Sequence, residues 1–456
     1  MTKPLLLHHP VRIRKELLTC LGTFSEWVWW PSQQPSFSYP FTLLLSGLSL
    51  PSLPALRLLE LLLGGNATSA NLISTQGPAT VVASSYQAVA NAINASVNNP
   101  ARFRQMPLTL NQAGVSDTNT GRQTLRDHQR RVTSFVQWAS FHANDYSAVS
   151  AQSGFMPTSV SVNGSRATVA GTEDFYLDLT IRDDGQPKDF SPEKAASLAE
   201  ARREGAVIAV GQTNHCVISF RHLVTLTKGQ NGWKIDTDVY VDDTPSAGDA
   251  FSFTTGRQNG GSQELDSSAI GVPFTTGKEG ETGFFASPGS QIQARLLHAN
   301  VNRSGAYQYA DRWWNDRNLR YGLYLEDCTN FISQCLYDGN GGRRPGTNDW
   351  RPFSVAFINT DTCYNYMRRT AAARANDGNN DYGRAYYWQK KYMIRGDLVF
   401  YDWDGNGTKD HAAIGVAYDG NGDLLVDAHT NDRYHVPWDL WRSGPAPTYY
   451  MLDLRW

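Results

Sequence analysis

The chain has 456 residues, more than one ordinary hydrophobic core accommodates, so we expect two folded domains with extensions. Hydrophobic residues make up 41% of the chain and charged residues 18%, a balance typical of globular proteins. The formal net charge of −2, without a long basic run, argues against a protein that binds nucleic acid.

Residues 1–70 differ in composition from the rest of the chain. Basic residues within 12–15 precede an uncharged, largely apolar run over 36–56, and small residues follow at 67–70. This order resembles an export signal, so we predict a secreted protein whose mature chain begins near Asn71. Two prolines interrupt the apolar run, and a stable membrane span is not expected. The alternative is an unstructured extension that arises from a misplaced start codon.

Residues 71–243 are predicted to form an accessory α+β domain. Two helical patterns open it, and alternating apolar segments follow, the first two joined by an Asn163-Gly164 turn signal. Helices followed by long antiparallel strands favour helices on one face of a curved sheet. The last strand resembles that of cystatin-like and nuclear-transport-factor-like rolls, so we expect a cystatin-like roll with a binding or positioning role. The predicted helices span 79–98 and 122–148, and the predicted strands 159–162, 167–170, 175–181, 216–226 and 232–240.

Residues 244–292 are rich in Gly, Ser and Thr and are predicted to be a linker at the domain boundary. Residues 293–456 then form the second predicted domain, which mixes helices and antiparallel strands. Its helices are expected at 302–318, after Asp327 and after 360, and its strands at 398–401, 411–418, 424–429 and 449–454.

Cys328 directly follows an acidic pair at the start of a predicted helix. Asp327 is a good N-cap, and apolar residues follow it at helical spacing. The positive end of a helix dipole favours the thiolate, which is the form that attacks carbonyl carbons. We therefore predict that Cys328 is a catalytic nucleophile. Cys335 is assigned to packing or to a disulfide with Cys363, since five cysteines without a CxxC pair favour neither a disulfide scaffold nor a zinc cluster.

His411 is the predicted general base, because it starts a strand directly after a loop. In a hairpin with its turn at 419–422, the residue opposite His411 is about Thr430, and His429 and Asn431 lie diagonal to it. Either of these two could hold one imidazole nitrogen so that the other faces the thiol. Together the residues make a triad for thiol-dependent acyl transfer. For each residue alone, the alternative is an ordinary structural role.

Three segments of the second domain resemble signatures of NlpC-like peptidases. These segments are Asp327–Phe331, Arg395–Tyr401 and Asp410–Ile414. The NlpC-like peptidases are papain-fold enzymes that cleave peptide amide bonds in bacterial cell walls.

A bacterial family of putative amidase domains is a closer match. Its pattern appears as YADRWWN at 309–315, DCTNFISQ at 327–334, DWDGNG at 402–407 and AHTNDR at 428–433. The resemblance covers about 300–445 and implies a papain-like α+β fold without a required cofactor. It also implies Cys328 as nucleophile, His411 as base and His429 as the third polar residue, acting on a peptide or cell-wall substrate. Thr329-Asn330 replaces the Ser-Gly of the better-known peptidases, which leaves the substrate preference open.

The loop before His411 also fits part of a calcium-binding pattern. Oxygen-bearing residues alternate along it, with Gly407 at the turn. The Glu expected at position twelve is replaced by Ala413, so two interpretations remain. One is a structural calcium, and the other is a hydrogen-bonded turn that positions His411. The candidate ligands are Asp402, Asp404, Asn406, Thr408 and Asp410.

Two rival functions remain open at this point. A catalytically inactive module on the same fold would bind wall glycans or peptides through its many aromatic side chains. A transglutaminase-like enzyme would use the same Cys and His for acyl transfer to an amine. The sequence predicts neither the scissile bond nor the oligomeric state.

Overall fold

The computed structural model describes residues 76–97, 107–240, 301–324, 326–344, 348–370, 373–378, 382–403, 405–440 and 448–455. All of them belong to one compact unit, Thr68–Trp456. The predicted export segment, residues 1–70, and the predicted linker, residues 244–292, lie outside the described residues. Among the residues that are described, no helix is both long and apolar enough to cross a membrane.

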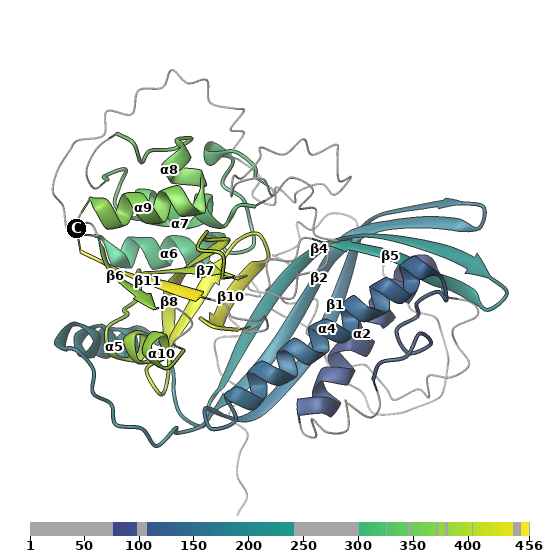
Figure 1. Ribbon diagram of the computed structural model, residues 1–456, viewed down its shortest axis with the longest axis horizontal. Coiled ribbons are helices and arrows are strands. Elements are labelled where there is room, and N and C mark those ends of the chain that lie inside the picture. Colours follow the sequence, from purple (N-terminus) through teal and green to yellow (C-terminus); the bar gives the residue numbers. More distant parts are fainter. Residues whose placement is uncertain are drawn as a thin grey trace, which may run out of the picture. The chain divides into compact units, whose positions relative to one another are not determined.

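The first half of the unit is a strongly bent antiparallel sheet with two helices packed on one face (Figure 1). The Asn163-Gly164 turn forms as predicted, with Gly164 at φ 60° joining the first two strands. The predicted second helix is shorter than expected: it ends at Phe141, and the first strand already starts at Tyr146. The helices are α2 (Pro78–Val97) and α4 (Asn119–Phe141), and the strands in sheet order are β1 (Tyr146–Asn163), β2 (Arg166–Ile181), β4 (Thr213–Gly229) and β5 (Gly232–Tyr240).

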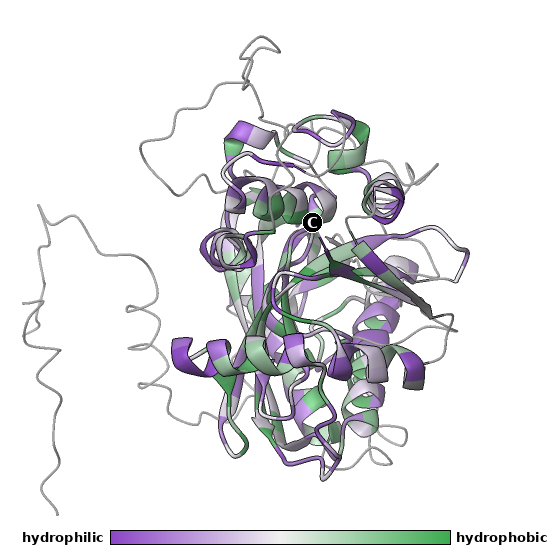
Figure 2. Ribbon diagram, turned by 90° about the vertical axis from the view of Figure 1, so that its left-hand side faces the viewer, coloured by the Kyte–Doolittle hydropathy of each residue, from purple (hydrophilic) through white to green (hydrophobic). Residues whose placement is uncertain are grey.

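Helix α4 shows why these residues form this layer. Thr118 caps the helix by accepting a hydrogen bond from the Gly121 N–H group. Apolar residues at helical spacing, among them Val132, Phe135 and Trp138, are buried against the sheet, whereas Arg122 and Arg126 are exposed. In Figure 2 hydrophobic and hydrophilic residues accordingly alternate around the helices.

The second half is a mixed-layer region in which helices cover both faces of a second set of strands (Figure 1). The strand order is β10-β9-β8-β7-β11-β6, and all of these pairings are antiparallel. Helices α6, α7 and α9 lie on one side, and α5 and α10 on the other. The bounds are α5 (Pro192–Glu204), α6 (Arg303–Trp313), η4 (Leu319–Tyr321), α7 (Cys328–Gly339), α8 (Val355–Ile358), α9 (Thr360–Arg369), β6 (Ala373–Gly378), α10 (Tyr382–Lys391), β7 (Leu398–Asp402), β8 (His411–Asp419), β9 (Leu424–Ala428), β10 (Asp432–Pro437) and β11 (Thr448–Leu454).

Strand β7 explains why its sequence is a continuous apolar run. Leu398 and Phe400 pack into the core that contains α6 and α7. Val399 and Tyr401 point to the other core, which α10 covers. Because both faces of the strand are buried, alternation with polar residues is not needed, and the predicted buried strand is confirmed.

The two halves share one sheet, which has eleven strands among the described residues. Strand β10 pairs with β4, so the bent sheet continues into the second one. The segment between β2 and β4 leaves the first half altogether: α5 packs on β8, and β3 (Val207–Ile208) pairs with β8 in parallel. The predicted α+β class is therefore confirmed, while the papain-like and cystatin-like assignments remain predictions.

Candidate active site

Cys328 is the first residue of α7, as the sequence predicted, and its exposed fraction is 2%. Asp327 occupies the N-cap position, but its side chain makes no capping hydrogen bond. The hydroxyl oxygens of Thr329 and Thr360 lie 3.7 Å and 4.0 Å from the thiol sulfur. The thiol is thus buried at the positive end of the helix.

Thr430 supplies the missing cap. Its hydroxyl oxygen accepts hydrogen bonds from the backbone N–H groups of Asp327, at 3.1 Å, and Cys328, at 3.3 Å. Thr430 has φ 83°, a left-handed conformation that strains a β-branched residue and is found mainly where function requires it. The sequence predicted Thr430 only as the residue opposite His411, because nothing in its residue type indicates a left-handed turn.

His411 starts β8 and pairs with Tyr401 of β7. Its ring is fully buried and stacks with the ring of Trp403, with centroids 6.1 Å apart. The pairing of β8 with β9 runs from Ile414–Asp427 to Tyr418–Leu424, so the predicted position of Thr430 opposite His411 lies beyond the paired residues and stays a prediction. Strand β9 itself ends at Ala428, so the residues from 429 onward form the turn into β10.

The face of β8 that carries His411 is the one away from α7. Ala412 and Ile414 pack into the core with α7, whereas Ala413 and Tyr401 pack into the opposite core. The start of α7 is held by the turn that follows β9, where the Thr430 hydroxyl accepts from the N–H groups of Asp327 and Cys328.

The predicted orienting role of His429 requires a correction. Its Nδ1 lies 2.6 Å from Oδ2 of Asp327, and its Nε2 lies 2.8 Å from the carbonyl oxygen of Trp313. The ring also stacks on Phe331, with centroids 3.8 Å apart. His429 lies on the α7 face of its strand, opposite to that of His411, so both nitrogens engage groups other than the predicted base. Asn431, the alternative third residue, is fully buried beside this turn.

A buried chain of charges extends from Asp327 into the first half of the unit. Nε of Arg317 lies 3.2 Å from Asp327, and Nη2 of Arg317 lies 2.5 Å from Asp432. Arg221 of β4 reaches the other oxygen of Asp432, at 3.1 Å. Burial lowers the pKa of His429, and the neighbouring Arg317 lowers it further. The sequence did not identify these arginines, since their shared partner Asp432 lies more than a hundred residues away along the chain.

The loop between β7 and β8 is a tight hydrogen-bonded turn over its described residues. Asp402 accepts hydrogen bonds from the N–H groups of Gly405, Asn406 and Gly407, at 2.8 to 3.1 Å. Asp410 accepts one from Trp403, at 2.9 Å. These bonds match the second interpretation of the sequence, a turn that positions His411. Asp404 lies outside the described residues, and the calcium ion remains a prediction.

The other cysteines behave as core thiols. Cys335 and Cys363 are both free and fully buried, which excludes a disulfide between them in this structure. Burial raises the pKa of Cys363 to about 12 and that of Cys335 well above its ordinary value. Neither thiol is therefore suited to nucleophilic attack at neutral pH.

Two solved structures align with part of this chain, each with a low TM-score. The intermembrane-space region of the chloroplast protein ARC6 aligns with a TM-score of 0.18 and 15% identity, over 36% of this chain and 97% of that one. An NTF2-like superfamily protein from Salmonella enterica aligns with a TM-score of 0.17 and 12% identity, over 35% of this chain and 90% of that one.

Two curated proteins of Bacillus subtilis, both described as uncharacterized, share sequence with this chain. YhbB is 31% identical over 141 residues, which cover 30% of this chain and 44% of YhbB. YjcM is 27% identical over 158 residues, which cover 33% of this chain and 36% of YjcM. The chain thus matches less than half the length of either relative. Residues 300–452, which contain Cys328, His411 and His429, match the family described as "Putative amidase domain", so this part of the chain is similar to an amidase-domain family.

Proposed function

We propose that the protein is a cysteine-dependent amide hydrolase with Cys328 as nucleophile and His411 as general base. The observation that carries the proposal is the position of Cys328 at the N-terminus of α7, where the helix dipole favours the thiolate. The match of residues 300–452 to an amidase-domain family supports amide bonds as the substrate class.

The reaction would proceed in two halves. The Cys328 thiol transfers its proton to His411 and attacks the amide carbon, and His411 then protonates the leaving amine. Water, deprotonated by His411, next attacks the thioester and releases the acid and the thiol. Because the N–H group of Cys328 already donates to Thr430, this hydroxyl must yield if that N–H group is to stabilise the oxyanion.

Access to the thiol is the main structural requirement of this mechanism. Cys328 is 2% exposed, so a substrate has to displace the side chains that cover it. We propose cell-wall peptides as the substrate, on the resemblance to NlpC-like peptidases, and secretion would bring the enzyme to them.

Mass analysis of purified wall fragments tests the proposal directly. Fragments incubated with the wild type should gain free amine and carboxyl termini, and the Cys328→Ala variant should leave them intact. His411→Ala should slow cleavage by roughly 10²–10⁴-fold, the usual contribution of a general base. Cleavage by the Cys328→Ala variant, or no cleavage by the wild type, would refute the proposal for this substrate class.

Iodoacetamide labelling at neutral pH separates the enzyme from a catalytically inactive binding module. An active nucleophile should react faster at Cys328 than at Cys335, although both are buried. Equal rates at the two thiols would favour the binding module. Products with new amine–acyl links instead of free termini would indicate a transglutaminase-like acyl transferase.

A further inference from the structure

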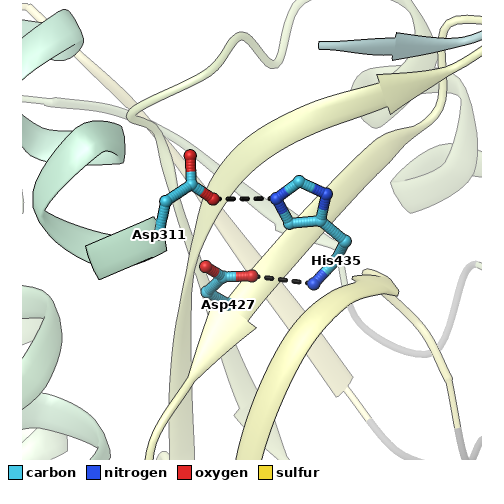
Figure 3. Close-up of side chains that lie close together, drawn as sticks. All are labelled: Asp311, Asp427 and His435. Atoms are coloured by element: carbon cyan, nitrogen blue, oxygen red, sulfur yellow. Dashed lines mark hydrogen bonds and ion pairs between the residues drawn. The ribbon is translucent and has the colours of Figure 1, made fainter. Parts of the chain in front are cut away.

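A second cluster of ionisable side chains lies outside the proposed catalytic residues. Asp311 of α6, Asp427 of β9 and His435 of β10 converge, each from a different element (Figure 3). One candidate ligand atom from each residue lies within 4.8 Å of the other two. Nε2 of the His435 ring is 2.8 Å from Oδ1 of Asp311. The backbone N–H group of His435 donates to Oδ1 of Asp427, at 2.8 Å.

An ordinary ion pair explains only part of this arrangement. The pair between His435 and Asp311 needs no second carboxylate, and the bond from the backbone N–H group of His435 uses only one oxygen of Asp427. Asp427 is fully buried, and its Oδ2 has no hydrogen-bond partner among the residues that the structure describes. In Figure 3 this second oxygen lies on the Asp311 side. A buried carboxylate oxygen without a partner is costly, so a ligand for it is expected.

We propose that Asp311, Asp427 and His435 form a binding site for a divalent transition cation such as Zn²⁺. One imidazole nitrogen and two carboxylate oxygens suit zinc or manganese, whereas calcium and magnesium prefer oxygen ligands only. Two carboxylates also balance the charge of such a cation.

Solvent reaches the cluster from the Asp311 side, because the side chains of His435 and Asp311 are 16% and 40% exposed. Ligand atoms in a tetrahedral zinc site lie about 3.3 Å apart, so the three candidate atoms, which lie within 4.8 Å of one another, would move closer together on binding. Three protein ligands would leave one position for water.

A cation bound to Asp311, Asp427 and His435 would link α6 to β9 and β10 close to the proposed active site. Asp311 lies two residues before Trp313, whose carbonyl group holds His429, and Asp427 lies two residues before His429 itself. Any effect of the cation on Cys328 rests on the proposed function, whereas the cation site does not.

Equilibrium dialysis of the full chain against Zn²⁺ and Mn²⁺, after removal of metals with EDTA, tests the site without an activity assay. The wild type should hold about one cation at this site and unfold at a higher temperature when loaded. Asp427→Asn and His435→Gln should weaken binding by more than about 100-fold, beyond the loss typical of residues that only support a ligand. An excess of Ca²⁺ should not displace the bound cation.

Matched variants keep the experiment decisive. Asp311→Asn changes a partly exposed residue, so it preserves the fold even if Asp427→Asn does not. Asp178→Asn is the control, because Asp178 and His215 form a simple Asp–His pair on the surface, 2.7 Å apart. Binding that persists in Asp311→Asn, equal loss in Asp178→Asn, displacement by Ca²⁺ or no binding by the wild type would each overturn the proposal.

Discussion

At the scale of single residues, this protein depends on buried histidines that are paired with carboxylates from distant parts of the chain. His142 of the α4 C-terminus is the clearest case: its Nδ1 lies 2.6 Å from Asp145 and its Nε2 lies 2.8 Å from Asp439. Burial lowers the pKa of His142, but Asp439 and Asp145 together outweigh it and raise the pKa to about 10. The charged imidazole therefore joins the two halves of the unit.

This pairing predicts a loss of stability at alkaline pH. The folded-state pKa of about 10 lies above the ordinary value of 6.5, so the stabilisation is complete below pH 6.5 and disappears as the pH rises through 10. The His142→Gln variant should be less stable than the wild type at pH 6 by about 3–5 kcal/mol, because it leaves buried carboxylates without their partner. Urea unfolding at pH 6 and pH 9.5 should show a smaller pH difference for this variant.

The control for that experiment is His215→Gln. His215 forms an exposed pair with Asp178, whose two side chains are 75% and 49% exposed, so solvent screens the interaction. A His142→Gln variant with the same pH dependence as the wild type would contradict the assignment.

Thr430 offers a second test at the residue scale. The Thr430→Val variant has the same shape but leaves the N–H groups of Asp327 and Cys328 without an acceptor, at a cost of about 1–3 kcal/mol. The Thr430→Ser variant keeps the hydroxyl and should retain most of the stability. Urea unfolding and the rate of Cys328 labelling measure both effects. Equal behaviour of the Val and Ser variants would show that the hydroxyl is not the cap of α7.

At the scale of elements, the α6–α7 pair places Cys328 through a very close helix contact. A Cβ atom on Gly339 would lie 2.4 Å from the backbone nitrogen of Ala306, and one on Gly305 would lie 2.3 Å from the carbonyl oxygen of Gly339. Both neighbours are backbone atoms that cannot rotate away. Glycine at positions 305 and 339 therefore allows α6 and α7 to approach this closely.

The Gly339→Ala variant should consequently push the helices apart. We expect a destabilisation of about 1–3 kcal/mol, the usual cost of overpacking, measured by chemical unfolding. Gly229→Ala is the matched control, because no heavy atom lies within 4 Å of a Cβ at that position. A Gly339→Ala variant as stable as the control would mean that the contact relaxes freely.

The turn between β7 and β8 is the second element that the site depends on. The Asp402→Ala variant removes the acceptor of three backbone N–H groups and should cost about 1–3 kcal/mol of stability. Asp402→Asn keeps one side-chain oxygen and should be intermediate. Thermal unfolding of the metal-free protein with and without added Ca²⁺ separates the turn from the predicted calcium ion: a higher unfolding temperature of the wild type with Ca²⁺ would favour the ion.

At the scale of the whole molecule, the two halves are joined by more than the chain that connects them. Strand β10 pairs with β4, and Arg221 bonds Asp432 at 3.1 Å. Helix α5 supplies Lys194, whose buried ammonium group donates to the carbonyl group of Gln389, at 2.9 Å. The second half is therefore covered in part by residues from the first.

Residues 293–456 alone should accordingly fail to fold cooperatively. Without α5, β3 and β4, strands β8 and β10 would expose apolar surface and unpaired backbone groups. Thermal unfolding monitored by circular dichroism should show no sharp transition for this fragment, in contrast to residues 71–456. A sharp transition at the same temperature in both would contradict this interdependence.

Local patterns in the sequence determined a large part of this protein. Three features follow from interactions between residues close in the chain: the Asn163-Gly164 turn, the buried run of β7 and the start of α7 at Cys328. Turn chemistry, alternation and helix capping act over a few residues, so they can be read without the fold.

The tertiary structure alone decided which partners each polar residue has. His429 is bound to Asp327 and Trp313, from 102 and 116 residues earlier in the chain, instead of to His411. Asp311 and Asp427 meet His435 only because α6 packs against β9, and α5 leaves its own half to cover β8. Such contacts depend on how elements far apart in the sequence pack together. Residue types alone do not determine them, because each polar residue could pair with many others in the chain.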